Sequence, residues 1–278
     1  PILTAYRVPI SWTVRGFGDS DDDLEQPLRR ALAQHPDVDA STRVWLLVAL
    51  IFETENDAAA HGMGEVLAWS EEAVAIARGS GDPTTLCAAL NARAYLSLGP
   101  DLVAERETLA TELLDVSRGH GLLGYEALAH WFLFLCASAR TDLVEAVRQA
   151  DLAVEKSTSG QLAALVQVVE VYRAVLSVLA GRLDDAQEAY RRLARRMAAT
   201  GMTNAAEAAV VFELVLAFAH GDTSPLTDTM VAMHDVYPDA MIEALVLCLL
   251  DAGRLDEARA RWATRTPLRR NYYWLARM

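Results

Sequence analysis

The chain has 278 residues, 53% of them hydrophobic, and carries a net charge of −13 from 25 basic and 38 acidic side chains. It is long and apolar enough to bury a sizeable core, while no uninterrupted apolar stretch reaches the roughly 18 residues of a membrane span. We therefore predict a soluble, cytoplasmic protein without a membrane partner. The acidic balance also argues against direct nucleic-acid contact by this segment, because binding to phosphates requires a basic face.

The first 20 residues contain Pro9 and two glycines and are expected to form the end of a preceding helix plus an irregular connector. Residues 21–278 are expected to form one elongated repeat domain, and we interpret the chain as a piece of a longer protein. The acidic run at 19–23 is not a calcium loop, because Leu24 and Arg30 stand where such a loop needs Gly and Glu. We interpret this run as an acidic cap of the first helix.

From residue 22 onward the sequence predicts helices, because apolar residues recur at helical spacing and no alternating stretch is long enough for a sheet. Helices that follow a turn, such as 183–200, have one apolar stripe and a charged back. Helices that precede a turn, such as 161–180, are apolar nearly all round. The expected helices are 22–35, 40–54, 64–79, 84–98, 101–118, 122–139, 142–157, 161–180, 183–200, 204–220, 224–236, 239–252 and 254–265.

One short phrase occurs twice: residues 180–186 read Ala-Gly-Arg-Leu-Asp-Asp-Ala, and residues 252–258 repeat it with Glu in place of the second Asp. Each copy lies between an apolar helix and an amphipathic one. Gly181 and Gly253 are therefore expected to end one helix in a left-handed conformation, and the acidic residues to start the next one, where the helix dipole favours negative charge. The phrase predicts a helical hairpin.

The two copies are 72 residues apart, which is two periods of about 36 and close to the period of a tetratricopeptide repeat (TPR). That pattern has a small residue after the turn and an aromatic residue one helical turn later, as in Ala186 with Tyr190 and Ala258 with Trp262. The predicted fold is all-α, a right-handed solenoid or superhelix of TPR-like helical hairpins. Looser copies of the phrase occur at 99–104, 141–146 and 220–222.

The sequence contains no recognisable catalytic or metal-binding pattern. The glycine pairs lack the remainder of a nucleotide-binding loop, and no His or Cys spacing indicates zinc. The three cysteines, each within an apolar helix, are expected to be buried thiols. Glu126 and His130 lie one helical turn apart and could form an acid/base pair, although an ordinary contact on a helix face is the simpler interpretation. We predict no enzymatic activity, no cofactor and no metal.

Residues 81–106, which begin Gly-Asp-Pro-Thr-Thr-Leu-Cys-Ala-Ala-Leu-Asn-Ala-Arg-Ala-Tyr, resemble the TPR-like C-terminal region of large actinobacterial transcriptional regulators. Residues 3–15 and the phrase Arg-Arg-Asn-Tyr-Tyr-Trp at 269–274 are similar to it as well. These regulators are the large Streptomyces antibiotic regulatory proteins (SARPs) and the large ATP-binding LuxR-type proteins. The resemblance covers essentially the whole chain.

In that family a DNA-binding domain contacts the promoter, an ATPase domain acts as a switch, and helical repeats sense a ligand or partner. The resemblance implies that this chain is the third part, the non-catalytic sensory and protein-interaction domain of a pathway-specific activator of secondary metabolism. It assigns no DNA-binding, ATP-binding or magnesium-binding residue to this chain, because the chain lacks the segments that hold such residues. The role of the domain follows from the family, whereas no catalytic site does.

If the TPR register holds, the first helix of each hairpin lines a concave groove. The groove is then apolar and is expected to hold a partner helix or a small apolar ligand, with Arg93 as polar anchor and Trp131 as aromatic wall. The residues placed on this side by counting back from each turn are Arg93, Leu128, Trp131, Leu135, Val168, Val171, Val175, Val178, Val211, Val215 and Phe218.

Two other interpretations stay open. The same apolar residues pack against each other as core if the superhelix is tightly wound. Alternatively, the chain is an assembly module that mediates self-association of the parent regulator, using Tyr272, Tyr273 and Trp274 or the open ends of the solenoid.

Overall fold

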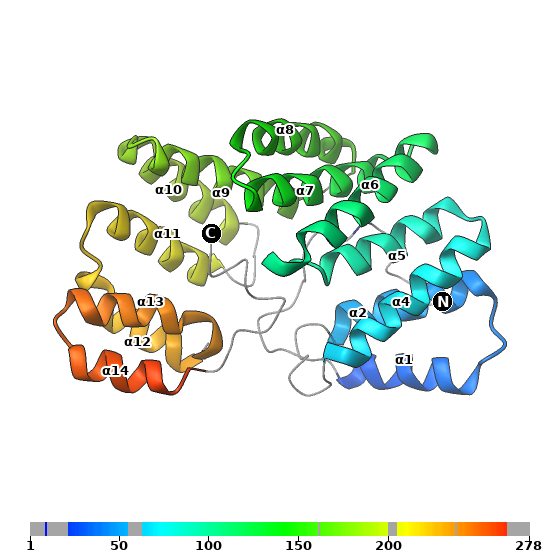
Figure 1. Ribbon diagram of the computed structural model, residues 1–278, viewed down its shortest axis with the longest axis horizontal. Helices are drawn as coiled ribbons and strands as arrows, with labels where there is room; N and C mark the ends of the chain where they lie inside the picture. Colours follow the sequence, from blue (N-terminus) through cyan, green and yellow to red (C-terminus); the bar gives the residue numbers. More distant parts are fainter. Residues whose placement is uncertain are drawn as a thin grey trace. The chain divides into compact units, whose positions relative to one another are not determined.

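The computed structural model describes Pro9 and residues 22–54, 63–160, 162–199, 205–236 and 238–265. Within these residues the chain forms 13 α-helices and two short 3₁₀ turns and no strand, which confirms the all-helical prediction (Figure 1). The helices begin and end within a few residues of the expected positions. The expectation for residues 1–20 lies outside the described residues except at Pro9, whose ring lies against Gly124, 2.7 Å from where a Cβ of that glycine would be.

Contacts along the chain group it into two compact units, Pro1–Val166 and Gln167–Met278. The sequence had led us to expect one elongated repeat domain. The boundary falls within a helix, α9 (Ala163–Leu179), so most of α9 belongs to unit 2. Each unit is described by itself below.

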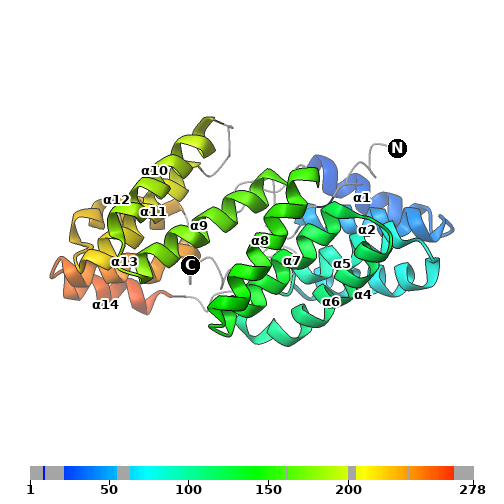
Figure 2. The same ribbon diagram turned by 90° about the horizontal axis from the view of Figure 1, so that it is seen from above.

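Unit 1 is a series of helices in which each packs on the next along the chain. In addition α2 contacts α5, and α5 contacts α7, so that every second helix belongs to one continuous layer. Figure 2 shows α7 and α8 as one such side-by-side pair. The elements are α1 (Asp22–Gln34), α2 (Ala40–Thr54), α4 (Met63–Ser80), α5 (Pro83–Tyr95), η3 (Pro100–Leu102), α6 (Val103–Gly119), α7 (Leu123–Ala139) and α8 (Leu143–Gly160).

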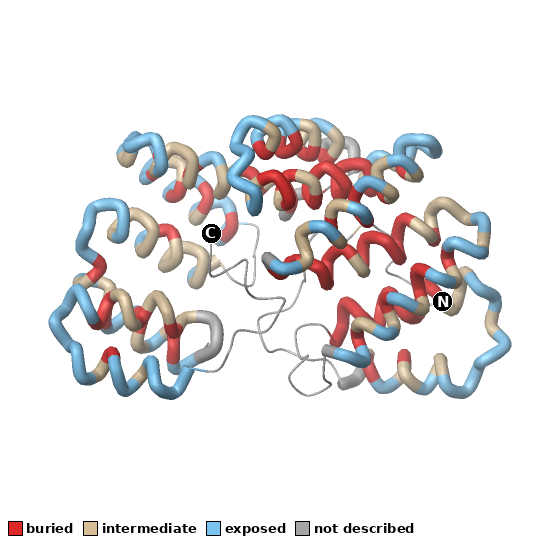
Figure 3. The backbone as a smooth tube through the Cα atoms, in the orientation of Figure 1, coloured by how far each residue is buried: buried red, intermediate tan, exposed pale blue. Residues whose placement is uncertain are grey.

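The core of unit 1 lies in this shared layer. Helix α7 is apolar all round and is enclosed by α5, α6 and α8, so that Trp131, Phe132 and Phe134 are almost completely buried. Helix α2 is equally enclosed, and every residue from Val44 to Thr54 is buried. Together with α5, these are the helices that are mostly red in Figure 3. A helix without a polar face requires cover on all sides, which explains why α2 and α7 are central in unit 1.

Unit 2 contains two smaller cores. In the first, α9, α10 and α11 enclose Ala186, Tyr190, Leu193 and Phe212; in the second, α12, α13 and α14 enclose Met230, Leu245, Cys248 and Leu249. Helix α11 contributes side chains to both clusters. The remaining elements are α10 (Leu183–Ala199), α11 (Ala205–His220), η4 (Ser224–Leu226), α12 (Thr227–Val236), α13 (Pro238–Asp251) and α14 (Leu255–Ala263).

The repeated phrase forms the helix ends that were predicted from it. Gly181 and Gly253 have φ of 72° and 73°. The next residue in each copy donates its N–H to a carbonyl five positions back, from Arg182 to Ser177 and from Arg254 to Leu249. Acidic side chains occupy the first turn of the following helices, α10 and α14. Gly121 and Gly221 end α6 and α11 in the same way, with Thr141 in that role after α7.

Candidate interaction face

Helix α9 has an apolar stripe that neither core cluster of unit 2 covers. Val168 and Val175 are half-buried and belong to neither cluster, and Leu179 is 71% exposed. The three residues are spaced by seven and four positions, which places them on one side of the helix. Two of them, Val168 and Val175, are positions that the sequence predicted for the groove.

Helix α11 is exposed in a similar way. It is among the most apolar helices of the chain, yet of its residues, all of which the structure describes, Phe212 alone is buried. Val211 is half-buried and outside both clusters, and Phe218 is 63% exposed. The contrast with α7 is visible in Figure 3, where α7 is largely red and α11 is largely tan. Most of the apolar surface of α11 lies partly open.

Other predicted positions in unit 2 contribute to the core instead. Val171, Val178 and Val215 are half-buried and pack against the cluster around Tyr190 and Phe212. The stripe is therefore narrower than the predicted groove lining. We define the α9/α11 stripe as Val168, Val175, Leu179, Val211 and Phe218.

In unit 1 the predicted groove residues belong to the packed interior. Leu128 and Trp131 have no exposed surface, and Leu135 is half-buried. The two buried residues present no surface to a ligand, so the interpretation as core describes them better than the interpretation as groove. The indole N–H of Trp131 has no hydrogen-bond partner, which indicates that packing determines its position.

Arg93 joins three helices. Its guanidinium donates to the carboxylate of Glu105 on α6, at 2.8 Å from Nε and 2.6 Å from Nη2, and to the hydroxyl of Ser70 on α4 at 3.0 Å. It also lies 3.4 Å from a carboxylate oxygen of Glu71 and donates to the Leu67 carbonyl. These contacts link α5, which carries Arg93, to α4 and α6. Because the donors are engaged within the protein, Arg93 is not available as the expected polar anchor for a ligand.

Glu126 and His130 are part of a buried polar cluster between α6, α7 and α8. His130 Nδ1 donates to Gln149 Oε1 at 2.6 Å, and Arg118 lies 3.4 Å from His130 Nε2 and 3.4 Å from the Glu126 carboxylate. Because Arg118 can only donate, Nε2 is the accepting nitrogen and the ring is neutral. Burial lowers the pKa of His130, and the Arg118 charge acts in the same direction.

Sequence reasoning found only the two members of this cluster that share a helix. It missed Arg118 and Gln149, and also Lys156, whose Nζ lies 3.7 Å from the Glu126 carboxylate. These residues come from neighbouring helices, and their convergence depends on how α6 and α8 pack on α7. Lys156 is the only lysine of the chain, a signal that the sequence did contain. His130 is 2% exposed, so its imidazole presents almost no surface to a substrate.

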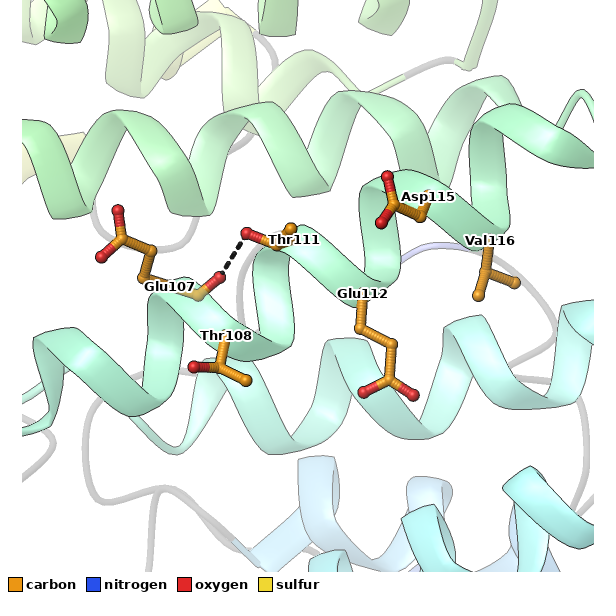
Figure 4. Close-up of a pocket in the computed structure, with 6 residues that line it drawn as sticks. All are labelled: Glu107, Thr108, Thr111, Glu112, Asp115 and Val116. Carbon is orange, nitrogen blue, oxygen red and sulfur yellow. Dashed lines mark hydrogen bonds between the residues drawn. The ribbon is translucent and has the colours of Figure 1, made fainter.

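A shallow hollow of about 490 Å³ lies along the outer face of α6 (Figure 4). Its side chains project from one helix and do not converge on a point. Two of its acids are engaged, Glu107 with Arg140 and Glu112 with Arg78, in bidentate ion pairs. The hydrogen bonds from Arg140 lower the pKa of Glu107, which therefore remains a carboxylate and is unsuited to acid catalysis.

A second hollow of about 410 Å³ lies between α9 and α10 in unit 2. Charged residues from both helices line it, among them Arg173, Arg192, Glu170 and Asp185. Both acidic and basic side chains line this hollow, so it has no single sign of charge that would select a charged ligand. Neither hollow includes a residue of the α9/α11 stripe.

The described part of the chain contains no group of three His, Cys, Asp or Glu side chains suited to a metal ion. Within the same residues no helix has the length and apolar character needed to cross a membrane. The geometry thus defines a class, an all-α protein in which each helix of unit 1 packs on the next and in which α9 and α11 of unit 2 carry partly open apolar side chains. The chain matches no known family model, curated protein or solved structure.

Proposed function

We propose that this chain is a non-catalytic, TPR-like interaction domain of a cytoplasmic transcriptional regulator, and that it binds a partner helix along the α9/α11 stripe. The observation that supports the proposal most directly is the exposure of the stripe, because apolar side chains spaced along one side of a helix are a common docking surface for an amphipathic helix. The regulatory role rests on the resemblance of residues 81–106 to the helical region of large actinobacterial regulators.

The dimensions of the stripe favour a helix over a small molecule. From Val168 to Leu179 it extends 11 residues along α9, which is about 16 Å at the rise of an α-helix. A partner helix that lies along α9 would cover this length with about three turns. Neither of the two hollows described above includes a residue of the stripe.

The arrangement of hairpins supports a TPR-like solenoid as the scaffold of this function. Five helices end in a left-handed residue with the same backbone hydrogen bonds, and in unit 1 every second helix contacts the next of its kind. In such a scaffold the first helix of each hairpin faces the concave side. Helices α9 and α11 continue the series α2, α5 and α7 as every second helix along the chain, so we assign them as first helices.

The proposal is tested by placing charge in the stripe. The double variant Val175→Glu/Val211→Glu should lose most of its binding of Nile red, an uncharged apolar probe, while keeping the far-ultraviolet circular dichroism of the parent. Val236→Glu, at a 65% exposed valine on α12 outside the stripe, is the matched control and should bind Nile red as the parent does. Equal binding by all three proteins would contradict a docking face at the stripe.

The regulatory part of the proposal has its own test. In cells that express the parent protein, the double variant is expected to change the transcript levels of a defined gene set, measured by RNA sequencing against the Val236→Glu control. If the double variant loses Nile red binding but leaves the transcript levels unchanged, the stripe is a docking face without the proposed regulatory role.

A second candidate function is self-association through α8. Leu143, Val144 and Val147 form an exposed apolar surface on the first turns of this helix, with Val144 84% exposed. In that case Val144→Lys converts a dimer into a monomer in sedimentation velocity without affecting Nile red binding. The predicted assembly residues Tyr272, Tyr273 and Trp274 lie outside the described residues.

A further inference from the structure

The hydrogen bonds of His130 on α7 leave one nitrogen of its ring for a second proton. Gln149 Nε2 donates to the Glu145 carboxylate at 2.8 Å, so the other atom of this amide, Oε1, faces the ring. Oε1 is an acceptor and lies 2.6 Å from His130 Nδ1, so Nδ1 carries the proton of the neutral ring. Two hydrogen bonds from Arg148 hold the Glu145 carboxylate in place. A second proton therefore binds to Nε2.

Nε2 is also the ring nitrogen that faces α6. Arg118 Nη2 lies 3.4 Å from it, and Arg118 Nε donates to the Glu126 carboxylate over the same distance. A guanidinium and an imidazolium both carry positive charge, and neither has an acceptor to offer the other. In the observed arrangement protonated His130 and Arg118 therefore repel each other, and one of the two side chains has to move.

Burial decides which of the two moves. His130 is almost fully buried, whereas the Arg118 side chain is 59% exposed and is able to turn into water. The Glu126 carboxylate is buried and requires a positively charged partner. Glu126 lies four positions before His130 on α7 and on the same side of the helix, so the imidazolium can take the place of the guanidinium. Lys156 on α8, 3.7 Å from the same carboxylate, is a second cation of this site.

We propose that this cluster is a pH-dependent switch in which protonated His130 replaces Arg118 as the partner of Glu126 and releases the Arg118 side chain into solvent. Arg118 belongs to the last turn of α6, and its two contacts link that turn to α7. Protonation therefore loosens the attachment of the end of α6. The switch lies in unit 1 and stands independently of the proposed function, which concerns the α9/α11 stripe.

Burial and the surrounding charges set the pH at which the switch acts. Burial is the largest influence and lowers the pKa of His130 below its ordinary value of 6.5. Arg118 from α6 and Arg148 from α8 disfavour the protonated ring, while Glu126 from α7 favours it. The pKa of Glu145 on α8 is about 2, so this group stays a carboxylate while His130 titrates. The switch thus operates in acidic conditions, below pH 6.5.

Nuclear magnetic resonance of the ¹⁵N-labelled chain tests the proposal between about pH 8 and about pH 4.5. The ¹⁵N shift of His130 Nε2 reports protonation of the ring, and the heteronuclear NOE of Arg118 Nε reports whether that side chain is ordered. The NOE of Arg118 should fall to the value of a free side chain, with the same midpoint as the His130 titration. Arg148, whose ion pair with Glu145 takes no part in the exchange, is the internal control and should keep its NOE.

Two variants separate the switch from a general effect of acid. In His130→Gln the NOE of Arg118 should stay constant over the whole range, because the amide does not titrate. In Arg118→Gln the midpoint of His130 should rise by about one pH unit, because protonation no longer displaces a positive charge. Arg140→Gln, at an exposed arginine that pairs with Glu107, is the matched control and should leave this midpoint unchanged.

Three results would overturn the proposal. An Arg118 side chain that stays ordered while His130 becomes protonated would show that the two cations coexist. A ring that remains neutral down to about pH 4.5, or an unchanged midpoint in Arg118→Gln, would show that the imidazole and the guanidinium are not coupled. These readouts do not involve Nile red binding at the α9/α11 stripe, so failure here is distinguishable from failure of the proposed function.

Discussion

Tyr190 on α10 and Phe212 on α11 stack with their ring centroids 4.6 Å apart and hold the three-helix core of unit 2 together. Tyr190 is almost fully buried, and its hydroxyl has no hydrogen-bond partner. Burial raises the pKa of Tyr190 to about 12. The ring therefore acts as a large apolar side chain whose hydroxyl group is a cost to folding.

This relationship predicts opposite effects for two substitutions of Tyr190. Tyr190→Phe removes an unpaired buried hydroxyl and should raise the free energy of unfolding by about 1 kcal/mol. Tyr190→Ala removes the ring and should lower it by about 3–5 kcal/mol. Urea unfolding followed by circular dichroism measures both. A destabilising Tyr190→Phe would mean that the hydroxyl has a partner, for example an ordered water.

The helix end at Thr141 is predicted to be strained. Thr141 has φ of 58°, a left-handed conformation that the equivalent residues of the other hairpins adopt as glycine. Thr141→Gly should therefore raise the free energy of unfolding by about 1 kcal/mol. The reciprocal change Gly181→Thr, where no neighbouring atom lies within 4 Å of the new Cβ, should lower it by about the same amount. The urea unfolding midpoints of the two variants, each compared with the parent, measure these changes. Midpoints that shift in the same direction would contradict the argument.

The buried polar cluster predicts a dependence of stability on pH. Burial lowers the pKa of His130 below its ordinary value of 6.5, so the unfolded chain binds this proton more readily than the folded one. The contribution of His130 is fully present above pH 6.5 and is lost as the pH falls below it. Arg118, Glu126, Glu145 and Arg148 also face this site. The pKa of Glu145 is about 2, so its own contribution is lost only at much lower pH.

Urea unfolding between about pH 8 and about pH 5.5 checks this prediction. His130→Gln should flatten the decline in stability of the parent over this range. His120→Gln, at an exposed histidine of the α6 C-terminus, is the control and should leave the slope unchanged. A parent and a His130→Gln variant with the same slope would show that another group carries the dependence.

Arg93 is predicted to matter for stability and not for ligand binding. Arg93→Ala breaks its contacts to Glu105 and Ser70 and leaves the Glu105 carboxylate without this partner, so it should cost about 2–4 kcal/mol of unfolding free energy. Arg93→Lys should recover less than half of this loss, because a single ammonium group cannot make the contacts that Nε, Nη1 and Nη2 of Arg93 make with Glu105 and Ser70. A variant with parent-like stability but reduced Nile red binding would restore Arg93 as a ligand anchor.

The local structure of this chain could be predicted from its sequence. Helices form wherever apolar residues recur at helical spacing, and Gly181 and Gly253 end them because glycine adopts positive φ without a steric penalty. The buried thiols of Cys87, Cys136 and Cys248 were predictable in the same way, since each lies within an apolar helix. These features depend on residues within one or two helical turns of each other.

The tertiary structure decided which apolar residues are core and which are surface. Trp131 and Phe218 both lie on strongly apolar helices and were both predicted to line the groove, yet Trp131 is fully buried because α5, α6 and α8 enclose α7, while Phe218 is 63% exposed. Arg93 likewise has its partners on α4 and α6, 12 to 26 residues away in the chain. The sequence determines the face of a helix on which a side chain lies, whereas the packing of neighbouring helices determines whether that face is covered.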